Sequence, residues 1–205
     1  MQLDFGGIAK GYIAQQVRDL LARRGQNRCL IAIAGDIVAG DPPLDADGKE
    51  TEGWKIGVAP LDKPDGPPSR MLRLKNCSVS TSGDAFQFVE INGVRYSHIV
   101  DPQTGLGLTQ RSSVTILAPD GADADGLATA VTILGVERGL KLIEQSQHTA
   151  ATHKTAALIV LATSNGLTVP RPSSRLTLLN NSFSKLNRNS LTRARATGSP
   201  GISCA

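Results

Sequence analysis

The sequence predicts a mixed α/β (α+β) fold in which antiparallel-rich sheets are flanked by helices. Two segments show the apolar spacing of helices, and several short apolar segments between Pro- and Gly-rich loops are typical of strands. The pair Asn92-Gly93 lies between two alternating segments and indicates a β-hairpin, because both residues tolerate positive φ. The 205 residues are enough for one domain with a hydrophobic core.

The first part of the chain is predicted to hold one helix and two strands. Residues 8–24 carry apolar side chains roughly at helical spacing. Short apolar strands are expected at 29–34 and 54–59, and the Asp-, Gly- and Pro-rich segments 40–53 and 60–70 are expected to be loops.

The middle of the chain is predicted to be β-rich from residue 78 onward and to end in helices and a strand. The predicted elements, in chain order, are hairpin strands at 86–91 and 94–99, a turn at 101–105, a strand at 112–118, helices at 122–134 and 136–146, and a closing strand at 156–163.

Charge is distributed unevenly along the chain. The net charge is +4, yet no acidic residue follows Glu144, and residues 1–144 carry 15 basic and 18 acidic groups. The body therefore has no basic excess, and with aromatics at 3% we expect no nucleic-acid partner. We predict that residues 1–170 form the catalytic-motif part of one domain. We expect the basic, Ser/Asn/Arg-rich residues 171–205 to be a disordered tail.

Cysteine usage and hydropathy exclude several classes of protein. Cys29, Cys77 and Cys204 are too few and too scattered for a disulfide framework or a zinc site. No apolar segment approaches the ~20 residues that span a membrane. The N-terminal residues show no export signal.

The first candidate motif is LDFGGIAKGY, residues 3–12. Glycines that lead into a helix start let backbone N–H groups approach a phosphate, with Lys10 as a counter-charge. It matches neither the P-loop spacing nor G-x-G-x-x-G. By itself it is more typical of a tight turn followed by a solvated lysine.

The second candidate motif is YSHIVDPQTG, residues 96–105. His98 ends a predicted strand beside an Asp-Pro turn, where binding and catalytic residues are commonly placed. It could transfer a proton near neutral pH or bind a phosphate. The alternative is a structural hydrogen bond.

The third candidate motif is ADADGLATA, residues 122–130. Asp125 and Thr129 are i and i+4 on the predicted helix, so their oxygens lie on one face and could bind a hard cation such as Mg²⁺. The alternative is helix capping by Asp123 or Asp125 near the helix start.

These motifs, in this order and together with AGDI (34–37) and STSGD (80–84), closely resemble the bacterial FAD:protein FMN transferases of the ApbE type, long described as thiamine-biosynthesis lipoproteins. The resemblance extends from residue 3 to about residue 161 and implies a partial flavin-transferase fold. It also implies roles for seven residues: FAD contacts for Asp4, Lys10 and Ile99, metal ligands for the Gly7 carbonyl, Asp125 and Thr129, and an active-site role for His98.

The resemblance further implies an activity: Mg²⁺-dependent transfer of FMN from FAD to a threonine hydroxyl of a target protein, with release of AMP. The acceptor would be a flavoprotein subunit of a membrane redox complex of the Nqr or Rnf class, and the location periplasmic or lipid-anchored at the inner membrane. Three alternatives stay open: an FAD pyrophosphatase that yields FMN and AMP, a non-catalytic flavin-binding fragment, and a nucleotide-binding domain unrelated to flavin.

The sequence departs from the family pattern at several places. Ala34-Gly35-Asp36 stands where Gly-Gly-Asp is usual, and Gly126 replaces a common alanine, which weakens a helix slightly. Residues after 170 do not resemble the family, and its members have roughly as much sequence again before the first motif.

Overall fold

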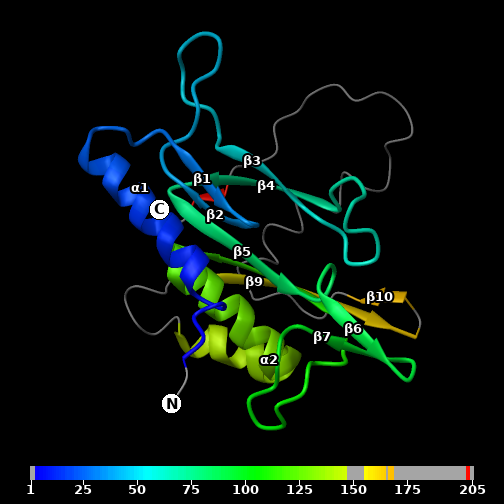
Figure 1. Cartoon of the computed structure of the whole chain (residues 1–205). Coiled ribbons are helices and arrows are strands. Elements are labelled where there is room, and N and C mark those ends of the chain that lie inside the picture. The colour runs from blue at the N-terminus through cyan, green and yellow to red at the C-terminus, as the bar shows by residue number, and fades with distance from the viewer. Residues whose placement is uncertain (1–2, 147–154, 165, 169–201, 204–205) are drawn as a thin grey trace, which may run out of the picture.

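A six-stranded antiparallel sheet is the centre of the computed structural model, which describes residues 3–146, 155–164, 166–168 and 202–203 (Figure 1). Every pair of neighbouring strands in this sheet is antiparallel. Its strands, in spatial order, are β1 (Leu30–Ile33), β2 (Asp36–Ala39), β5 (Cys77–Gly83), β8 (Ser112–Ala118), β9 (Ala156–Thr163) and β10 (Gly166–Thr168).

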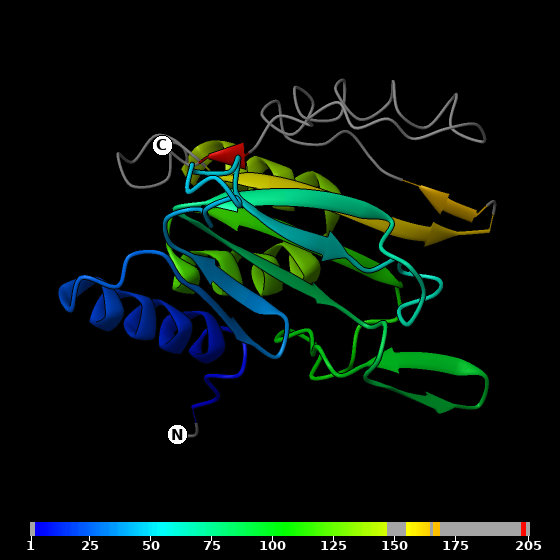
Figure 2. The same cartoon turned by 90° about the horizontal axis from the view of Figure 1, so that it is seen from above.

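Two smaller sheets accompany the central one. The first has the order β11 (Ile202–Ser203), β4 (Arg70–Lys75), β3 (Trp54–Val58), with β11 parallel to β4. The second is the hairpin of β6 (Phe88–Ile91) and β7 (Val94–Ser97), which projects away from the central sheet (Figure 2).

Two helices complete the described structure. Helix α2 (Gly121–Ser146) runs along one face of the central sheet and is kinked at Gly135, where φ is +74°. Helix α1 (Ala9–Arg23) packs against α2 and against β1 and β2 at the sheet edge. Among the described residues, no helix combines the length and the apolar character needed to span a membrane.

The hydrophobic core has two layers, one on each face of the central sheet. On β8, Val114 and Ile116 belong to the cluster that packs against α2, whereas Leu117 belongs to the cluster beneath β3 and β4. Successive side chains of a strand point to opposite faces, so a strand buried on both faces reads as a continuous apolar segment. All seven residues of β8 are buried.

The structure confirms the predicted mixed fold, both helical regions, the hairpin and the predicted strands, with shifts of one or two residues at their ends. The two helices predicted at 122–134 and 136–146 form one kinked element. Strands β2, β4, β10 and β11 were not predicted, and β5 lies in the segment that was predicted only as β-rich. Of the tail predicted at 171–205, all but residues 202–203 lie outside the described residues.

Candidate functional site

The glycine turn before α1 folds on itself through its first carboxylate. Asp4 Oδ1 accepts a hydrogen bond from Gly6 N at 2.7 Å, and the carbonyl of Phe5 accepts from Ile8 N and Ala9 N. No side chain of its own segment caps the helix. Ala9 N thus has a partner in the turn, whereas the N–H groups that follow it in the first turn of α1 need partners from elsewhere.

Asp125 of α2 supplies one such partner. Its Oδ2 accepts a hydrogen bond from Gly11 N at 3.0 Å, and the residue is only 2% exposed. A carboxylate near a helix N-terminus is favoured by both the N–H groups and the helix dipole. The contact requires close helices: a Cβ on Gly11 would clash with the Gly121 carbonyl and lie 2.7 Å from Asp125 Cβ.

The sequence analysis left open that Asp123 or Asp125 caps the helix at 122–134, and the structure contradicts this alternative. Asp120, not Asp123 or Asp125, caps α2: its Oδ1 accepts from Ala122 N at 2.8 Å and from Asp123 N at 3.4 Å. Asp125 instead faces α1. Its carboxylate is therefore committed to a tertiary site.

Lys10 places its ammonium among three oxygens. Nζ donates to the Gly6 carbonyl at 3.1 Å and lies 3.2 Å from Asp36 Oδ2 and 3.6 Å from Asp125 Oδ1. The side chain of Lys10 is 38% exposed, so the ammonium joins two buried carboxylates to the solvent. This arrangement differs from a freely solvated lysine.

Asp36 is the second buried carboxylate, at 4% exposure. It is the first residue of β2, directly after the two-residue turn Ala34-Gly35, whose φ values are +48° and +99°. Ser80 Oγ donates to its Oδ1. Burial raises the pKa of Asp36, and the charge of Asp125 adds to this, while the Ser80 hydroxyl and Lys10 oppose it.

Gly7 lies beside Thr129, whose hydroxyl is a further oxygen in this region. A Cβ on Gly7 would lie 3.1 Å from Thr129 Cγ2 and 3.2 Å from Thr129 Oγ1, so a side chain at this position would require Thr129 to shift by a few tenths of an ångström. Ser82 Oγ on β5 is 3.3 Å from the same Oγ1. Turn, helix and strand thus converge on Thr129.

His98 belongs to a different element, the segment that follows the exposed hairpin. Its Nδ1 is 3.1 Å from the Gln87 carbonyl, and its ring is exposed, while the adjacent Ile99 is buried. Because a carbonyl can only accept, Nδ1 carries the hydrogen, which leaves the lone pair of the neutral ring on Nε2.

Asp36 and Asp125, joined by Lys10, form a carboxylate cluster. Strand β5 connects the hairpin to this carboxylate cluster. Ser82 contacts Thr129, and Asp84, one residue beyond the end of β5, binds Arg95 of β7 at 2.7 Å through Oδ2. Arg111 Nε lies 3.7 Å from the same oxygen. Asp84 therefore anchors the hairpin that precedes His98.

Residues 1–153 match the ApbE family. The chain belongs to this family. Its relatives include the FAD:protein FMN transferases of Treponema pallidum, 38% identical over 71% of this chain and 41% of the relative, and of Haemophilus influenzae, 30% identical over 80% and 44%.

Solved ApbE structures have the same fold. The flavin transferase ApbE from Vibrio cholerae is 31% identical with a TM-score of 0.69, covering 86% of this chain and 52% of that one. The ApbE protein from Thermotoga maritima is 30% identical with a TM-score of 0.68, and the match covers 86% of this chain and 53% of that one. The chain thus spans about two fifths of the curated relatives and about half of the solved structures.

Of the residues to which the ApbE resemblance gives roles, the structure brings together two pairs: Lys10 Nζ lies 3.6 Å from Asp125 Oδ1, and Gly7 lies beside Thr129. Asp4 lies in the same glycine turn, whereas His98 and Ile99 follow the hairpin. The roles themselves stay predictions.

Sequence analysis gave no role to three residues that contact the predicted site: Asp36, Ser80 and Ser82. Asp36 pairs with Lys10, Ser80 donates to Asp36, and Ser82 contacts Thr129. Their motifs, AGDI and STSGD, are part of the family pattern, but a serine on a strand is common. The available signal was an acidic residue that opens an apolar segment directly after a turn.

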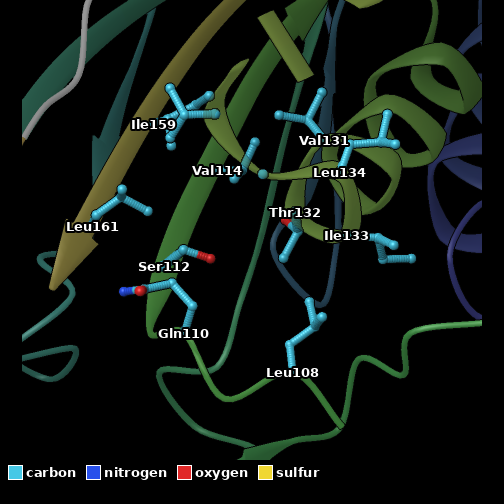
Figure 3. Close-up of a pocket in the computed structure, with 12 residues that line it drawn as sticks. Leu108, Gln110, Ser112, Val114, Val131, Thr132, Ile133, Leu134, Ile159 and Leu161 are labelled. Atoms are coloured by element: carbon cyan, nitrogen blue, oxygen red, sulfur yellow. The ribbon is translucent and has the colours of Figure 1, made fainter. Parts of the chain in front are cut away.

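A separate cavity of about 140 Å³ lies at the kink of α2 in this ApbE-family fold (Figure 3). Side chains from α2, β8 and β9 line it, mostly apolar. Two of its polar side chains have partners within the protein: Thr132 Oγ1 donates to the Ala128 carbonyl, and Gln110 Nε2 donates to the Ala162 carbonyl. Its lining includes neither a charged residue nor any of the predicted site residues.

Proposed function

We propose that this chain carries the cation-dependent part of an FAD:protein FMN transferase, which moves FMN from FAD to a threonine hydroxyl of a target protein and releases AMP. The observation that carries the proposal is the buried Asp125 carboxylate, which lies 3.6 Å from the Lys10 ammonium and one helical turn before Thr129, in a chain of the ApbE family.

The residues present fit Mg²⁺. Among the described residues no three His, Cys, Asp or Glu side chains gather. A cation here would rest on one carboxylate, one hydroxyl and one carbonyl, from Asp125, Thr129 and Gly7, which are the hard oxygen donors that Mg²⁺ prefers. Gly7 keeps open the space that a Cβ would fill. When bound, the ion would offset charge on the FAD pyrophosphate oxygens.

The chain's own residues would hold the donor and move one proton. Asp4 and Lys10 lie at the N-terminus of α1, where N–H groups and an ammonium favour a phosphate, and Ile99 would pack beside the flavin. The threonine oxygen forms a bond to the FMN phosphorus as the bond to AMP breaks. His98 Nε2 accepts the hydroxyl proton, since Nδ1 faces a carbonyl.

The acceptor is proposed to be a flavoprotein subunit of an Nqr- or Rnf-type membrane redox complex, with the reaction at the periplasmic side of the inner membrane. Support for both comes from the family alone. Water in place of threonine would make the same site an FAD pyrophosphatase.

Mass spectrometry of a threonine-bearing acceptor domain, incubated with the chain, FAD and Mg²⁺, tests the proposal. We expect a mass gain equal to FMN that disappears with chelator and in Asp125→Ala, while the matched variant Asp123→Asn retains it. His98→Gln should slow transfer without weakening FAD binding. AMP release without acceptor modification would support the pyrophosphatase. No reaction, with a full-length relative active alongside, would support a non-catalytic flavin-binding fragment.

A further inference from the structure

The ammonium of Lys10 is shared between two buried carboxylates that approach it from different elements. Asp36 Oδ2 on β2 is 3.2 Å from Nζ, and Asp125 Oδ1 on α2 is 3.6 Å away. Asp36 and Asp125 are 4% and 2% exposed. One half-exposed positive charge therefore serves two buried negative charges.

A divalent cation on Asp125 would compete with this ammonium. Mg²⁺ binds carboxylate oxygens at about 2.0–2.1 Å, and the other Asp125 oxygen, Oδ2, already accepts from Gly11 N. The oxygen left for the cation is Oδ1, the one that faces Lys10. Two positive charges at one carboxylate oxygen repel each other, so the ammonium needs another partner when a cation binds.

Asp36 is built to be that partner. Its Oδ1 accepts from Ser80 Oγ, which fixes the carboxylate so that Oδ2 faces Lys10. Strand β2 is paired on both sides, with β1 and β5, so the backbone of Asp36 is held in the central sheet. The ammonium is already closer to Asp36 Oδ2, at 3.2 Å, than to Asp125 Oδ1, at 3.6 Å.

We propose that Asp36 is a positioning residue of the cation site: it holds the Lys10 ammonium and so frees Asp125 Oδ1 for the divalent cation. This inference rests on the proposed function, because it takes Asp125 as a cation ligand. Asp36 touches neither the cation nor the substrate and acts through Lys10. Without Asp36, Asp125 would be the only carboxylate paired with the ammonium among the described residues, and the ammonium would compete with the cation for it.

A double-mutant cycle on Mn²⁺ affinity tests the proposal. The chain and its Asp36→Asn, Lys10→Met and Asp36→Asn/Lys10→Met variants are titrated with Mn²⁺ alone, and free Mn²⁺ is followed by electron paramagnetic resonance. We expect Asp36→Asn to weaken binding roughly tenfold, and Lys10→Met not to weaken it. In the Lys10→Met background, Asp36→Asn should have little further effect. A circular dichroism melt of each variant checks that it is folded.

Two results would overturn the inference. If Asp36→Asn weakens binding equally in both backgrounds, Asp36 acts only as a nearby negative charge. If Asp36→Asn leaves affinity unchanged, Lys10 does not compete with the cation. Asp123→Asn is the matched control, because it removes a carboxylate near Asp125 that has no ion pair with Lys10, and its effect should not depend on Lys10→Met.

The readout separates this inference from the proposed function. Absence of Mn²⁺ binding that depends on Asp125 in the unmodified chain would overturn both. If the four variants give the expected Mn²⁺ affinities but the chain transfers no FMN, only the proposed transferase activity is overturned, and the positioning role of Asp36 is retained.

Discussion

The carboxylate cluster and the hairpin that leads to His98 are held in opposite ways. Asp125 and Asp36 are 2% and 4% exposed and are fixed by contacts from α1, α2, β2 and β5. By contrast, all four residues of β6 are exposed, and Phe88 and Val89 are 46% and 52% exposed. A two-stranded hairpin is marginally stable alone, so this one depends on its anchor at Asp84.

The difference separates two tasks. Cation ligands must be preorganised within fractions of an ångström, which favours rigid, buried elements. His98, which is proposed to take the proton, must be reached by the threonine of a second protein, and this favours an exposed position. The two regions meet at the end of β5, where Ser82 touches Thr129 and Asp84 binds Arg95.

Separation of the helices should disrupt the cluster most strongly. Gly11→Ala places a methyl against the Gly121 carbonyl and 2.7 Å from Asp125 Cβ. Overpacking of this kind costs about 3 kcal/mol, so we expect the free energy of unfolding to fall by about that amount and Mn²⁺ binding to be lost. Urea denaturation and Mn²⁺ titration measure the two effects.

The matched control lies on α2. In Gly126→Ala the new Cβ meets Ile8 Cδ1 at an ordinary 3.7 Å. Helix propensity then predicts a gain of up to about 1 kcal/mol, with Mn²⁺ binding unchanged. Equal losses in Gly11→Ala and Gly126→Ala would contradict a role for close helix contact at Gly11.

Loosening the hairpin should affect transfer but spare the cluster. Asp84→Asn removes the charge that pairs with Arg95 and lies near Arg111. We expect a loss of about 1–2 kcal/mol in stability, faster amide hydrogen exchange in β6 and β7, and slower FMN transfer. Mn²⁺ affinity should stay within a factor of about two of the parent. A parallel loss of Mn²⁺ affinity would show that the two regions are not independent.

A smaller effect should appear in the pH dependence of stability. Burial raises the pKa of Asp36 in the fold, so its protonated form is favoured and its ionisation lowers stability as pH rises through the folded pKa. Asp36→Asn is neutral throughout. The free energy of unfolding of Asp36→Asn minus that of the parent should therefore increase from acid to neutral pH. Urea denaturation at several pH values, with chelator present, measures this difference. A difference that shrinks with rising pH would contradict this sign.

Local patterns in the sequence were sufficient for the long and regular elements. The period of α1, the apolar segment of β8 and the positive φ values at Asn92-Gly93 follow from side-chain spacing and turn chemistry. Strand β2 was not predicted because the turn before it contains Ala34, and alanine rarely adopts a φ of +48°. Strand β4 was not predicted because charged residues occupy half of its six positions.

The site was only partly predictable for a related reason. The i, i+4 pair of Asp125 and Thr129 is a local feature, so helical geometry places both side chains on one face. The ion pair of Lys10 with Asp36 joins α1 to β2, and the contact of Ser82 with Thr129 joins β5 to α2. Such contacts depend on how elements pack, which local spacing does not encode.

The most direct test of the account is a crystal structure of the chain soaked with Mn²⁺, with the ion located by anomalous diffraction. We predict one strong peak among the Gly7 carbonyl, Asp125 Oδ1 and Thr129 Oγ1, with the Lys10 ammonium moved toward Asp36. A peak bound to Asp36 in place of Asp125, or no peak in this region, would contradict the proposed cation site.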